Sequence, residues 1–182
     1  AFPAQAVQLS TPLEVSGLDQ RGIARLQRYI TNRLHLPLTV FGTTGEGSSF
    51  GFAERIKSIS ALKDAGIDAR RAIIGGVTSS SLEDALGQTS ILMDADCRAV
   101  LLAPPFYFKN VSDDGLFAWF AGLFEKLGSR ARDVILYNIP SVTAVALSVP
   151  LIGRLRAAFP QVITGVKDSS GDWDYTSELL AA

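Results

Sequence analysis

The chain has 182 residues, of which 47% are hydrophobic and 19% are charged, and its formal net charge is −1 at pH 7. This composition is typical of one globular domain with a substantial apolar core. The sequence contains no basic stripe or block of like charges that could neutralise phosphates, which argues against nucleic acid as a partner. It also contains no run of about 18 apolar residues, so we expect no membrane span.

Two residue types that occur once narrow the chemistry further. The single cysteine, Cys97, excludes a disulfide framework and fits a reducing compartment, so we expect a cytoplasmic protein. The single histidine, His35, leaves no imidazole cluster for a metal ion, and we expect neither a metal nor another cofactor. The first residues, AFPAQAVQL, lack the basic and apolar regions of a signal peptide.

Taken in order, the chain repeats one pattern, in which an apolar run of strand character is followed by a small or polar loop and then by a helical segment. Ala1–Pro3 resemble the end of an earlier strand. We predict the later strands at Leu38–Phe41, Ala72–Val77, Ala99–Ala103, Val134–Tyr137 and Val162–Lys167.

Helices are expected before and between these strands, because apolar residues recur there at helical spacing. Ser80 and Asp113 are candidate N-caps, and Gly66 and Gly128 are candidate helix stops. We predict helices at Leu18–Leu34, Gly51–Ala65, Ser80–Met93, Asp113–Leu127 and Ser148–Phe159.

Strands that alternate with helices predict parallel pairing with right-handed crossovers, in either a doubly wound sheet or a barrel. Eight repeats of about 26–35 residues would give the barrel length of about 250 residues. The sequence shows five strands and stops inside a helical segment at Tyr175–Ala182. We therefore interpret residues 1–182 as a single α/β domain, a partial TIM (β/α)8 barrel that covers about strands 2 to 6.

The loops after the strands carry the candidate chemistry, because ligands bind at the carboxyl ends of the strands in both architectures. After the first strand, Gly42, Thr43 and Thr44 combine a tight turn with two hydroxyls and backbone amides, which could bind a carboxylate or could form a common Gly/Thr turn. Glu46 is expected to be a carboxylate at a helix N-terminus.

Aromatic residues follow the third and fourth strands. In the stretch Pro104–Lys109 the aromatics either pack beneath the loop or lie at the mouth of the barrel. Tyr137 ends a buried strand, where its hydroxyl could move protons to a nearby lysine or could belong to a core tyrosine bonded to the backbone.

Lys167 ends the last strand, Val162–Lys167, whose β-branched residues predict that it is buried. The other four lysines of the sequence lie in helical or loop segments. A lysine among apolar neighbours loses hydration energy unless its amine is neutral or paired. The residues alone therefore leave open a nucleophilic lysine that forms a Schiff base and a buried, paired lysine.

Three of these motifs, GTTGE at Gly42–Glu46, YNIP at Tyr137–Pro140 and GVKDSSGD at Gly165–Asp172, together resemble the dihydrodipicolinate synthase / N-acetylneuraminate lyase family of class I aldolases. The resemblance covers essentially the whole chain. It implies a TIM barrel that forms a homotetramer, uses no external cofactor, and makes a lysine Schiff base with pyruvate or another 2-keto acid.

The same resemblance assigns roles to individual residues. It makes Lys167 the imine lysine and Tyr137 the proton shuttle. Thr43 and Thr44 match the pair that contacts the carboxylate of the keto acid, and Thr44 also takes part in proton transfer. Tyr107 matches a tyrosine that some members present to the site of a neighbouring subunit.

One position departs from the family pattern. Val142 stands where the lysine-biosynthetic enzymes carry an arginine for the carboxylate of the aldehyde substrate, and an apolar side chain cannot form that bidentate pair. We therefore expect a lyase that splits or dehydrates a 2-keto-3-deoxy sugar acid, or another pyruvate-releasing aldolase. The alternatives are a 4-hydroxy-tetrahydrodipicolinate synthase of lysine biosynthesis and, in another class, an inactive fragment or pseudoenzyme that binds a keto acid.

Overall fold

The structure of the protein is a computed structural model that describes residues 7–8, 28 and 36–182. The predicted helix Leu18–Leu34, the strand end at Ala1–Pro3 and His35 lie outside the described residues, apart from Arg28. No helix among the described residues is long and apolar enough to cross a membrane.

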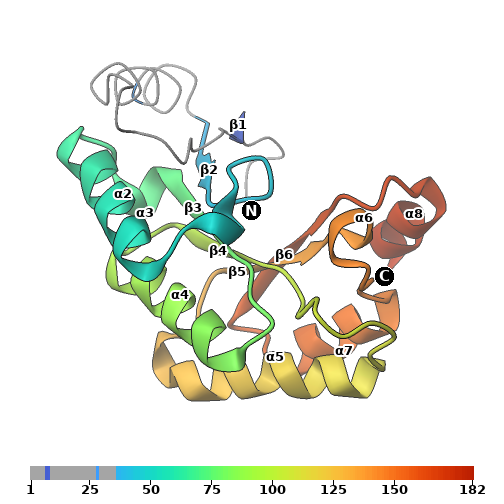
Figure 1. Cartoon of the computed structure of the whole chain (residues 1–182). Helices are drawn as coiled ribbons and strands as arrows, with labels where there is room; N and C mark the ends of the chain where they lie inside the picture. The colour runs from blue at the N-terminus through green and yellow to red at the C-terminus, as the bar shows by residue number, and fades with distance from the viewer. Residues whose placement is uncertain (1–6, 9–27, 29–35) are drawn as a thin grey trace. The chain divides into compact units, whose positions relative to one another are not determined.

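Six strands form one sheet in which neighbours in the sequence are neighbours in the sheet, in the order β1-β2-β3-β4-β5-β6 (Figure 1). The parallel pairing of β1 with β2, β2 with β3 and β5 with β6 agrees with the predicted crossover connections. The short strand β1 was not predicted. The strands are β1 Val7–Gln8, β2 Leu38–Val40, β3 Ile73–Val77, β4 Ala99–Leu102, β5 Val134–Asn138 and β6 Ile163–Asp168.

The predicted helices from Gly51 onward are confirmed within a few residues, because their apolar spacing is strongly helical. Two one-turn helices, α3 and α6, and two 3-10 turns, η1 and η2, are too short for a periodic pattern. The helices are α2 Phe52–Asp64, α3 Ala69–Ala72, α4 Leu82–Asp94, α5 Asp113–Leu127, α6 Pro140–Thr143, α7 Val149–Ala158 and α8 Trp173–Ala181, with η1 at Gly47–Ser49 and η2 at Gly128–Arg130.

Helix caps differ from the prediction by one residue at two N-termini. Ser112, not Asp113, is the N-cap of α5, and its side chain accepts a hydrogen bond from the backbone N–H of Gly115. Ser81, rather than Ser80, accepts from the N–H of Asp84 in the first turn of α4. A side-chain oxygen at the N-cap accepts from the amide of the residue three positions later, so neighbouring Ser and Asp residues can both serve as the N-cap. At the C-terminus of α5, Gly128 is the cap with φ 57°, as predicted.

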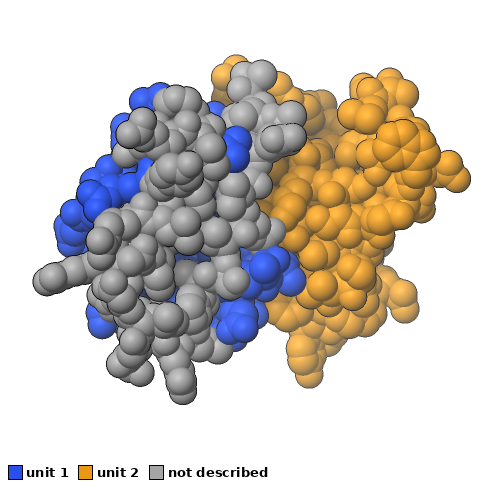
Figure 2. Space-filling view, turned by 90° about the horizontal axis from the view of Figure 1, so that it is seen from above, with its two compact units in different colours: residues 1–77, 87–100 blue, residues 78–86, 101–182 orange. Residues whose placement is uncertain are grey.

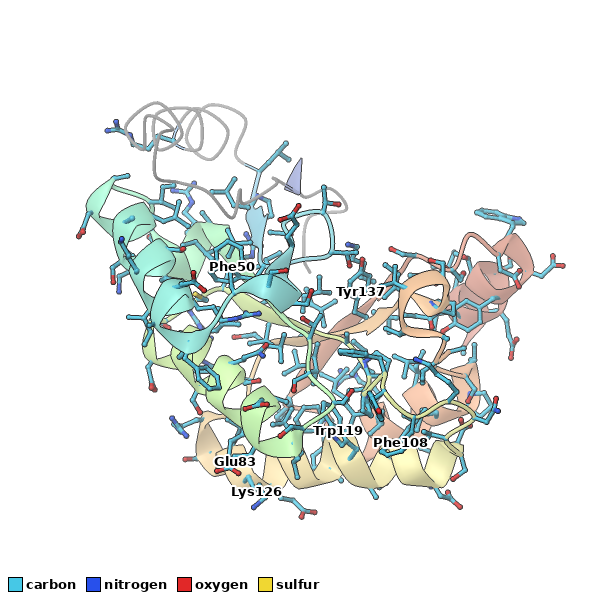
Figure 3. The ribbon with its side chains drawn as sticks, in the orientation of Figure 1. Phe50, Glu83, Phe108, Trp119, Lys126 and Tyr137 are labelled. Carbon is cyan, nitrogen blue, oxygen red and sulfur yellow. The ribbon has the colours of Figure 1, made fainter. Side chains whose placement is uncertain are left out.

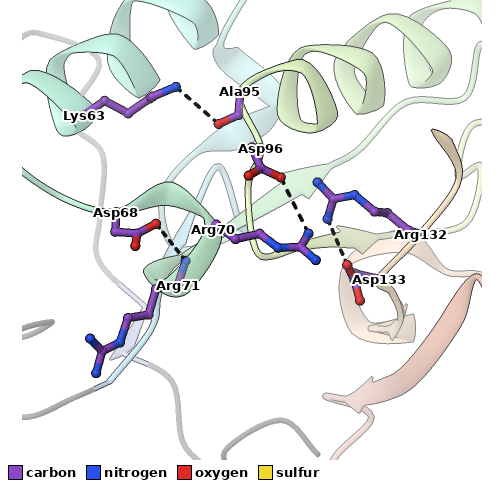
Figure 4. A network of polar contacts seen from close by, with 8 residues as sticks. All are labelled: Lys63, Asp68, Arg70, Arg71, Ala95, Asp96, Arg132 and Asp133. Atoms are coloured by element: carbon purple, nitrogen blue, oxygen red, sulfur yellow. Dashed lines mark hydrogen bonds and ion pairs between the residues drawn. The ribbon is translucent and has the colours of Figure 1, made fainter.

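The chain forms two compact units (Figure 2), one made of residues 1–77 and 87–100 and the other of residues 78–86 and 101–182. In the first unit, β2 and β3 are buried, and so are Ile59 of α2 and Leu92 of α4. A Cβ atom at Gly75 would lie 2.1 Å from Leu92 Cδ2, so only glycine allows this close packing. The ion pair between Arg70 and Asp96 of this unit lies on its surface (Figure 4).

The second unit has a core formed by α5, α7 and the strand β5. Six residues of α5 are buried, and its Phe124 packs edge-to-face against Phe159 after α7, with ring centroids 5.1 Å apart. Leu136 of β5 and Leu151 of α7 are fully buried. This core holds the strand end that carries Tyr137.

The last strand is less buried than predicted. In β6 only Ile163 is buried, Thr164 is exposed, and Val166 and Lys167 are half-buried. The reason is its place in the sheet, since β6 is the last strand in the order and has a strand neighbour on one side only within the described chain. Within the described chain, Lys167 is therefore half-buried, whereas the strand pattern had predicted that it is buried.

Candidate active site

The centre of the candidate site is a pair of residues on the neighbouring strands β5 and β6. The parallel register places Tyr137 opposite Lys167, so both side chains emerge at the carboxyl ends of their strands. Lys167 Nζ donates a hydrogen bond to Tyr137 Oη at 3.1 Å and lies 4.2 Å from the centre of the ring. Tyr137 is 3% exposed, and Figure 3 labels it at the end of its strand. At this distance a proton can pass directly between the phenol and the amine.

The next register position of the same strands holds a buried polar pair. Asn138, 1% exposed, lies opposite Asp168 and donates from Nδ2 to Asp168 Oδ1 at 2.9 Å. Its Oδ1 accepts from the backbone N–H of Leu147 at 3.0 Å, and its carbonyl accepts from Ser169 N–H at 2.8 Å. One asparagine therefore links β5, β6 and the segment before α7, and it fixes the register that brings Tyr137 to Lys167.

The Asp168 carboxylate accepts hydrogen bonds from three residues. These are Asn138 Nδ2, the N–H and hydroxyl of Ser170 at 3.0 and 2.9 Å, and the Thr176 hydroxyl at 2.7 Å. Burial is the largest single influence and raises the pKa of Asp168, but the hydrogen bonds together outweigh it, so the pKa lies below its ordinary value. Asp168 is therefore ionised at neutral pH beside the lysine-bearing strand end.

Tyr175 completes this polar cluster on α8. Its hydroxyl donates to the carbonyl of Leu147 at 2.7 Å. Burial, followed by the negative charges of Asp168 and Glu178, raises the pKa of Tyr175 to about 12. Sequence reasoning assigned no role to Asn138, Asp168 or Tyr175. The first two each follow a predicted site residue by one position, but the strand register that pairs them comes only from the structure.

The turn that follows β2 lies in the first unit and presents two hydroxyls. Thr43 and Thr44 are exposed, whereas Gly42, Gly45 and Gly47 are buried. The turn is closed by the N–H of Gly47 donating to the carbonyl of Gly42 at 3.1 Å. The turn predicted from the sequence is thus present, with its threonine side chains outward.

The prediction for Glu46 is wrong. Glu46 has φ 51° and precedes the short 3-10 turn η1, where its side chain makes no capping hydrogen bond. The carboxylate at the N-terminus of α2 belongs to Glu54, whose Oε2 accepts from the N–H of Gly51 at 2.9 Å. The helix begins six residues after Glu46, too far for that carboxylate to reach its first turn.

Tyr107 lies on an ordered loop and faces solvent. Tyr107 and Phe108 are 74% and 75% exposed, with their rings edge-to-face at 5.1 Å, so neither packs beneath the loop. Ser80 Oγ accepts from the N–H groups of Phe106 and Tyr107, and Lys109 Nζ donates to the carbonyl of Thr143 at 3.0 Å. Within the described chain Tyr107 makes no hydrogen bond or ring contact with Tyr137 or Lys167.

The described residues contain no group of three or more His, Cys, Asp or Glu side chains arranged to hold a metal ion.

Comparison with known proteins assigns the chain to a family. The profile of the dihydrodipicolinate synthetase family matches residues 2–182. An uncharacterized DapA-like lyase of Chloroflexus aurantiacus is 32% identical over 170 residues, which are 92% of this chain and 55% of that protein. The chain spans 55–59% of the length of the curated relatives it matches.

Solved structures agree with this assignment. The crystal structure of dihydrodipicolinate synthase from Agrobacterium tumefaciens superimposes with a TM-score of 0.87 at 49% identity, covering 97% of this chain and 62% of that one. The 2-keto 3-deoxygluconate aldolase from Picrophilus torridus gives a TM-score of 0.82 at 26% identity, covering 97% and 61%. These similarities confirm the predicted fold class, a partial TIM barrel, and the predicted resemblance. The chain belongs to the dihydrodipicolinate synthetase family.

Proposed function

We propose that the complete protein is a lyase that forms a Schiff base between Lys167 and pyruvate or a 2-keto-3-deoxy sugar acid. The observation that carries this proposal is the hydrogen bond between Lys167 Nζ and Tyr137 Oη at 3.1 Å, at the strand ends where TIM-barrel enzymes bind their substrates. Membership of a family that includes synthases and an aldolase supports the same reaction class.

In the proposed mechanism the Lys167 amine attacks the ketone carbon, a C–N bond forms, and the carbonyl oxygen leaves as water after it has gained two protons. Tyr137 delivers and removes protons during these steps, with Thr44 as a further member of the relay. With the imine at C2 of the sugar acid, a base removes the proton of the C4 hydroxyl, the C3–C4 bond breaks, and its electron pair passes to the protonated imine. This step releases C4 as an aldehyde and leaves an enamine between C2 and C3, which is protonated at C3 and hydrolysed to pyruvate and the free lysine.

Substrate binding is assigned to the turn after β2. We propose that Gly42, Thr43 and Thr44 hold the carboxylate of the keto acid through hydroxyls and backbone amides. The turn follows β2 and Lys167 lies in β6, each at the carboxyl end of its own strand.

The choice of a sugar acid depends on Val142. This residue lies in α6, two residues after the last residue of the YNIP motif, and is 59% exposed, so an apolar side chain faces solvent where a carboxylate ligand would need a cation. Synthesis of 4-hydroxy-tetrahydrodipicolinate is the second candidate, supported by the 49% identical synthase from Agrobacterium tumefaciens. A pseudoenzyme that binds a keto acid without turnover remains the alternative of another class, and labelling of Lys167 by pyruvate together with turnover would exclude it.

The proposal includes a homotetramer in a reducing, cytoplasmic setting. Exposed Tyr107 and Phe108 on a loop held by Ser80 supply an ordered aromatic surface suited to a second subunit. Within that assembly Tyr107 is proposed to reach the site of its neighbour.

The test is to trap the imine. Incubation of the complete protein with pyruvate and borohydride should attach one pyruvate-derived group irreversibly to the peptide that contains Lys167. Lys167→Arg should abolish labelling and turnover, because a guanidinium keeps its charge and is a poor nucleophile. Lys109→Arg is the matched control and should leave labelling unchanged. Label found on Lys109, or turnover that survives Lys167→Arg, would exclude the proposed role of Lys167.

A further inference from the structure

A buried arginine on α2 binds three backbone carbonyls, on two segments, around the turn that carries Thr43 and Thr44. Arg55 is 1% exposed. Its Nε donates to the carbonyl of Phe50 at 3.1 Å, Nη1 to that of Gly76 at 2.8 Å, and Nη2 to that of Gly47 at 2.5 Å. Gly47 and Phe50 lie on the part of the turn that leads into α2, and Gly76 lies in β3.

The burial of this charge calls for an explanation beyond packing. No carboxylate of the described residues pairs with Arg55, and burial lowers its pKa to about 10. Removing a guanidinium from water costs several kcal/mol unless its donors are satisfied, and an apolar side chain of similar volume would avoid that cost. What the arginine supplies, and an apolar residue cannot, is a planar fork that fixes three carbonyl groups at once.

Two glycines near Arg55 allow the backbone to come close to Phe41. A Cβ atom added at Gly47 would lie 1.9 Å from the carbonyl oxygen of Phe41, and one added at Gly76 would lie 2.1 Å from the same oxygen. Phe41 directly follows β2 with φ 57°, and the Arg55 guanidinium lies 4.8 Å from the centre of its ring. Phe41 also packs against Phe50, labelled in Figure 3, with ring centroids 5.5 Å apart. Arg55 therefore fixes the end of β2, the end of β3 and the returning part of the turn together.

Thr43 and Thr44 lie in the chain between Phe41, whose ring Arg55 contacts, and Gly47, whose carbonyl Arg55 binds. The N–H of Gly47 donates to the carbonyl of Gly42, and the N–H of Glu46 donates to that of Thr43, both at 3.1 Å. Because Arg55 anchors Gly47, these two hydrogen bonds transmit its position to the Thr43 backbone. The exposed threonine hydroxyls are thus presented by a turn whose own conformation depends on a side chain buried behind it.

We propose that Arg55 is a positioning residue for binding of the 2-keto acid, acting through the orientation of Thr43 and Thr44. The inference rests on the proposed function, because it takes the carboxylate of the keto acid as the ligand of this turn. It assigns to Arg55 no contact with the substrate.

The experiment compares Arg55→Lys with the wild-type complete protein. Lysine keeps the charge and the aliphatic stem but cannot form the three-way fork. We expect the pyruvate concentration for half-maximal borohydride labelling to rise about tenfold or more, with labelling at saturating pyruvate still on Lys167. Hydrogen exchange of the amides in residues 42–50 should become faster, since Gly47 loses its anchor.

A double-mutant cycle separates positioning from a general loss of stability. If Arg55 acts through Thr43, then Thr43→Val combined with Arg55→Lys should weaken pyruvate binding by clearly less than the product of the two single effects. Arg98→Lys is the matched control, because Arg98 of the same unit donates from Nη1 to the carbonyl of Arg71. It should leave the pyruvate dependence within twofold of wild type.

Each outcome decides the inference. Half-maximal labelling within twofold of wild type in Arg55→Lys, or independent effects in the cycle, would overturn it while the proposed function stands. Absence of label in the wild-type protein would instead overturn the proposed function. Arg55→Gln is the second variant, and if neither substitution yields a folded protein, Arg55 serves the fold and the positioning role is rejected.

Discussion

Replacing Asn138 by alanine tests the idea that a buried amide fixes the register of β5 and β6. The substitution removes the hydrogen bond to Asp168 Oδ1 and the acceptor of the Leu147 N–H. Leu147 is fully buried, so its amide would have no partner and no access to water. A buried donor left unsatisfied costs about 1–3 kcal/mol.

The loss of the hydrogen bond from Asn138 to Asp168 destabilises the fold by a smaller amount. A hydrogen bond to a charged group contributes about 1.5–3 kcal/mol, but Asp168 is half-buried and keeps its Ser170 and Thr176 donors, so we take about 1 kcal/mol. The expected loss in the free energy of unfolding is therefore about 2–4 kcal/mol, a large share of the 5–15 kcal/mol typical of folded domains.

Urea unfolding of the complete protein measures this loss. Thr164→Ala is the matched control on the same strand pair, because the exposed Thr164 hydroxyl makes only a 3.3 Å bond to the carbonyl of Val134. We expect about 0.5 kcal/mol or less for the control. If Asn138→Ala costs less than about 1 kcal/mol, comparable to the control, the proposed linking role of the amide is refuted.

Three further predictions concern the reaction and its pH dependence. Because of Val142, kcat/KM should be higher for cleavage of a 2-keto-3-deoxy sugar acid than for condensation of pyruvate with aspartate semialdehyde; a semialdehyde value of about 10⁴ M⁻¹s⁻¹ or more would contradict this. Tyr137→Phe should slow turnover by about 10²–10⁴-fold while pyruvate still binds, and steady-state kinetics with an unchanged kcat would argue against a proton shuttle. The folded-state pKa of Asp168 is depressed, so its stabilisation is complete above the unfolded pKa of about 3.9 and is lost as the pH falls below it. The stability difference between wild type and Asp168→Asn should therefore shrink on acidification below about pH 4, and a difference independent of pH would rule out this linkage.

Local sequence patterns were sufficient to predict much of this fold. Helices α5 and α7 follow from the spacing of residues such as Leu116, Phe120 and Leu155, since a period of 3.6 places them on one face. The strand ends followed in the same way, because each apolar run stops where small or polar residues begin. The order of residues along the chain was therefore enough to place Thr43, Tyr137 and Lys167 at or just after strand ends.

The partners of those residues depended on tertiary structure. The pairing of Asn138 with Asp168 requires the register of two strands 30 positions apart, and nothing local in either motif encodes that register. In the sequence, Arg55 has no feature that separates it from other residues of α2. Its hydrogen bonds to the carbonyls of Gly47 and Gly76 are known only from the structure. The half-burial of Lys167 likewise depends on the place of β6 in the strand order. Periodicity is a property of neighbouring residues in the chain, whereas register, burial and close backbone approach arise only from contacts between distant segments.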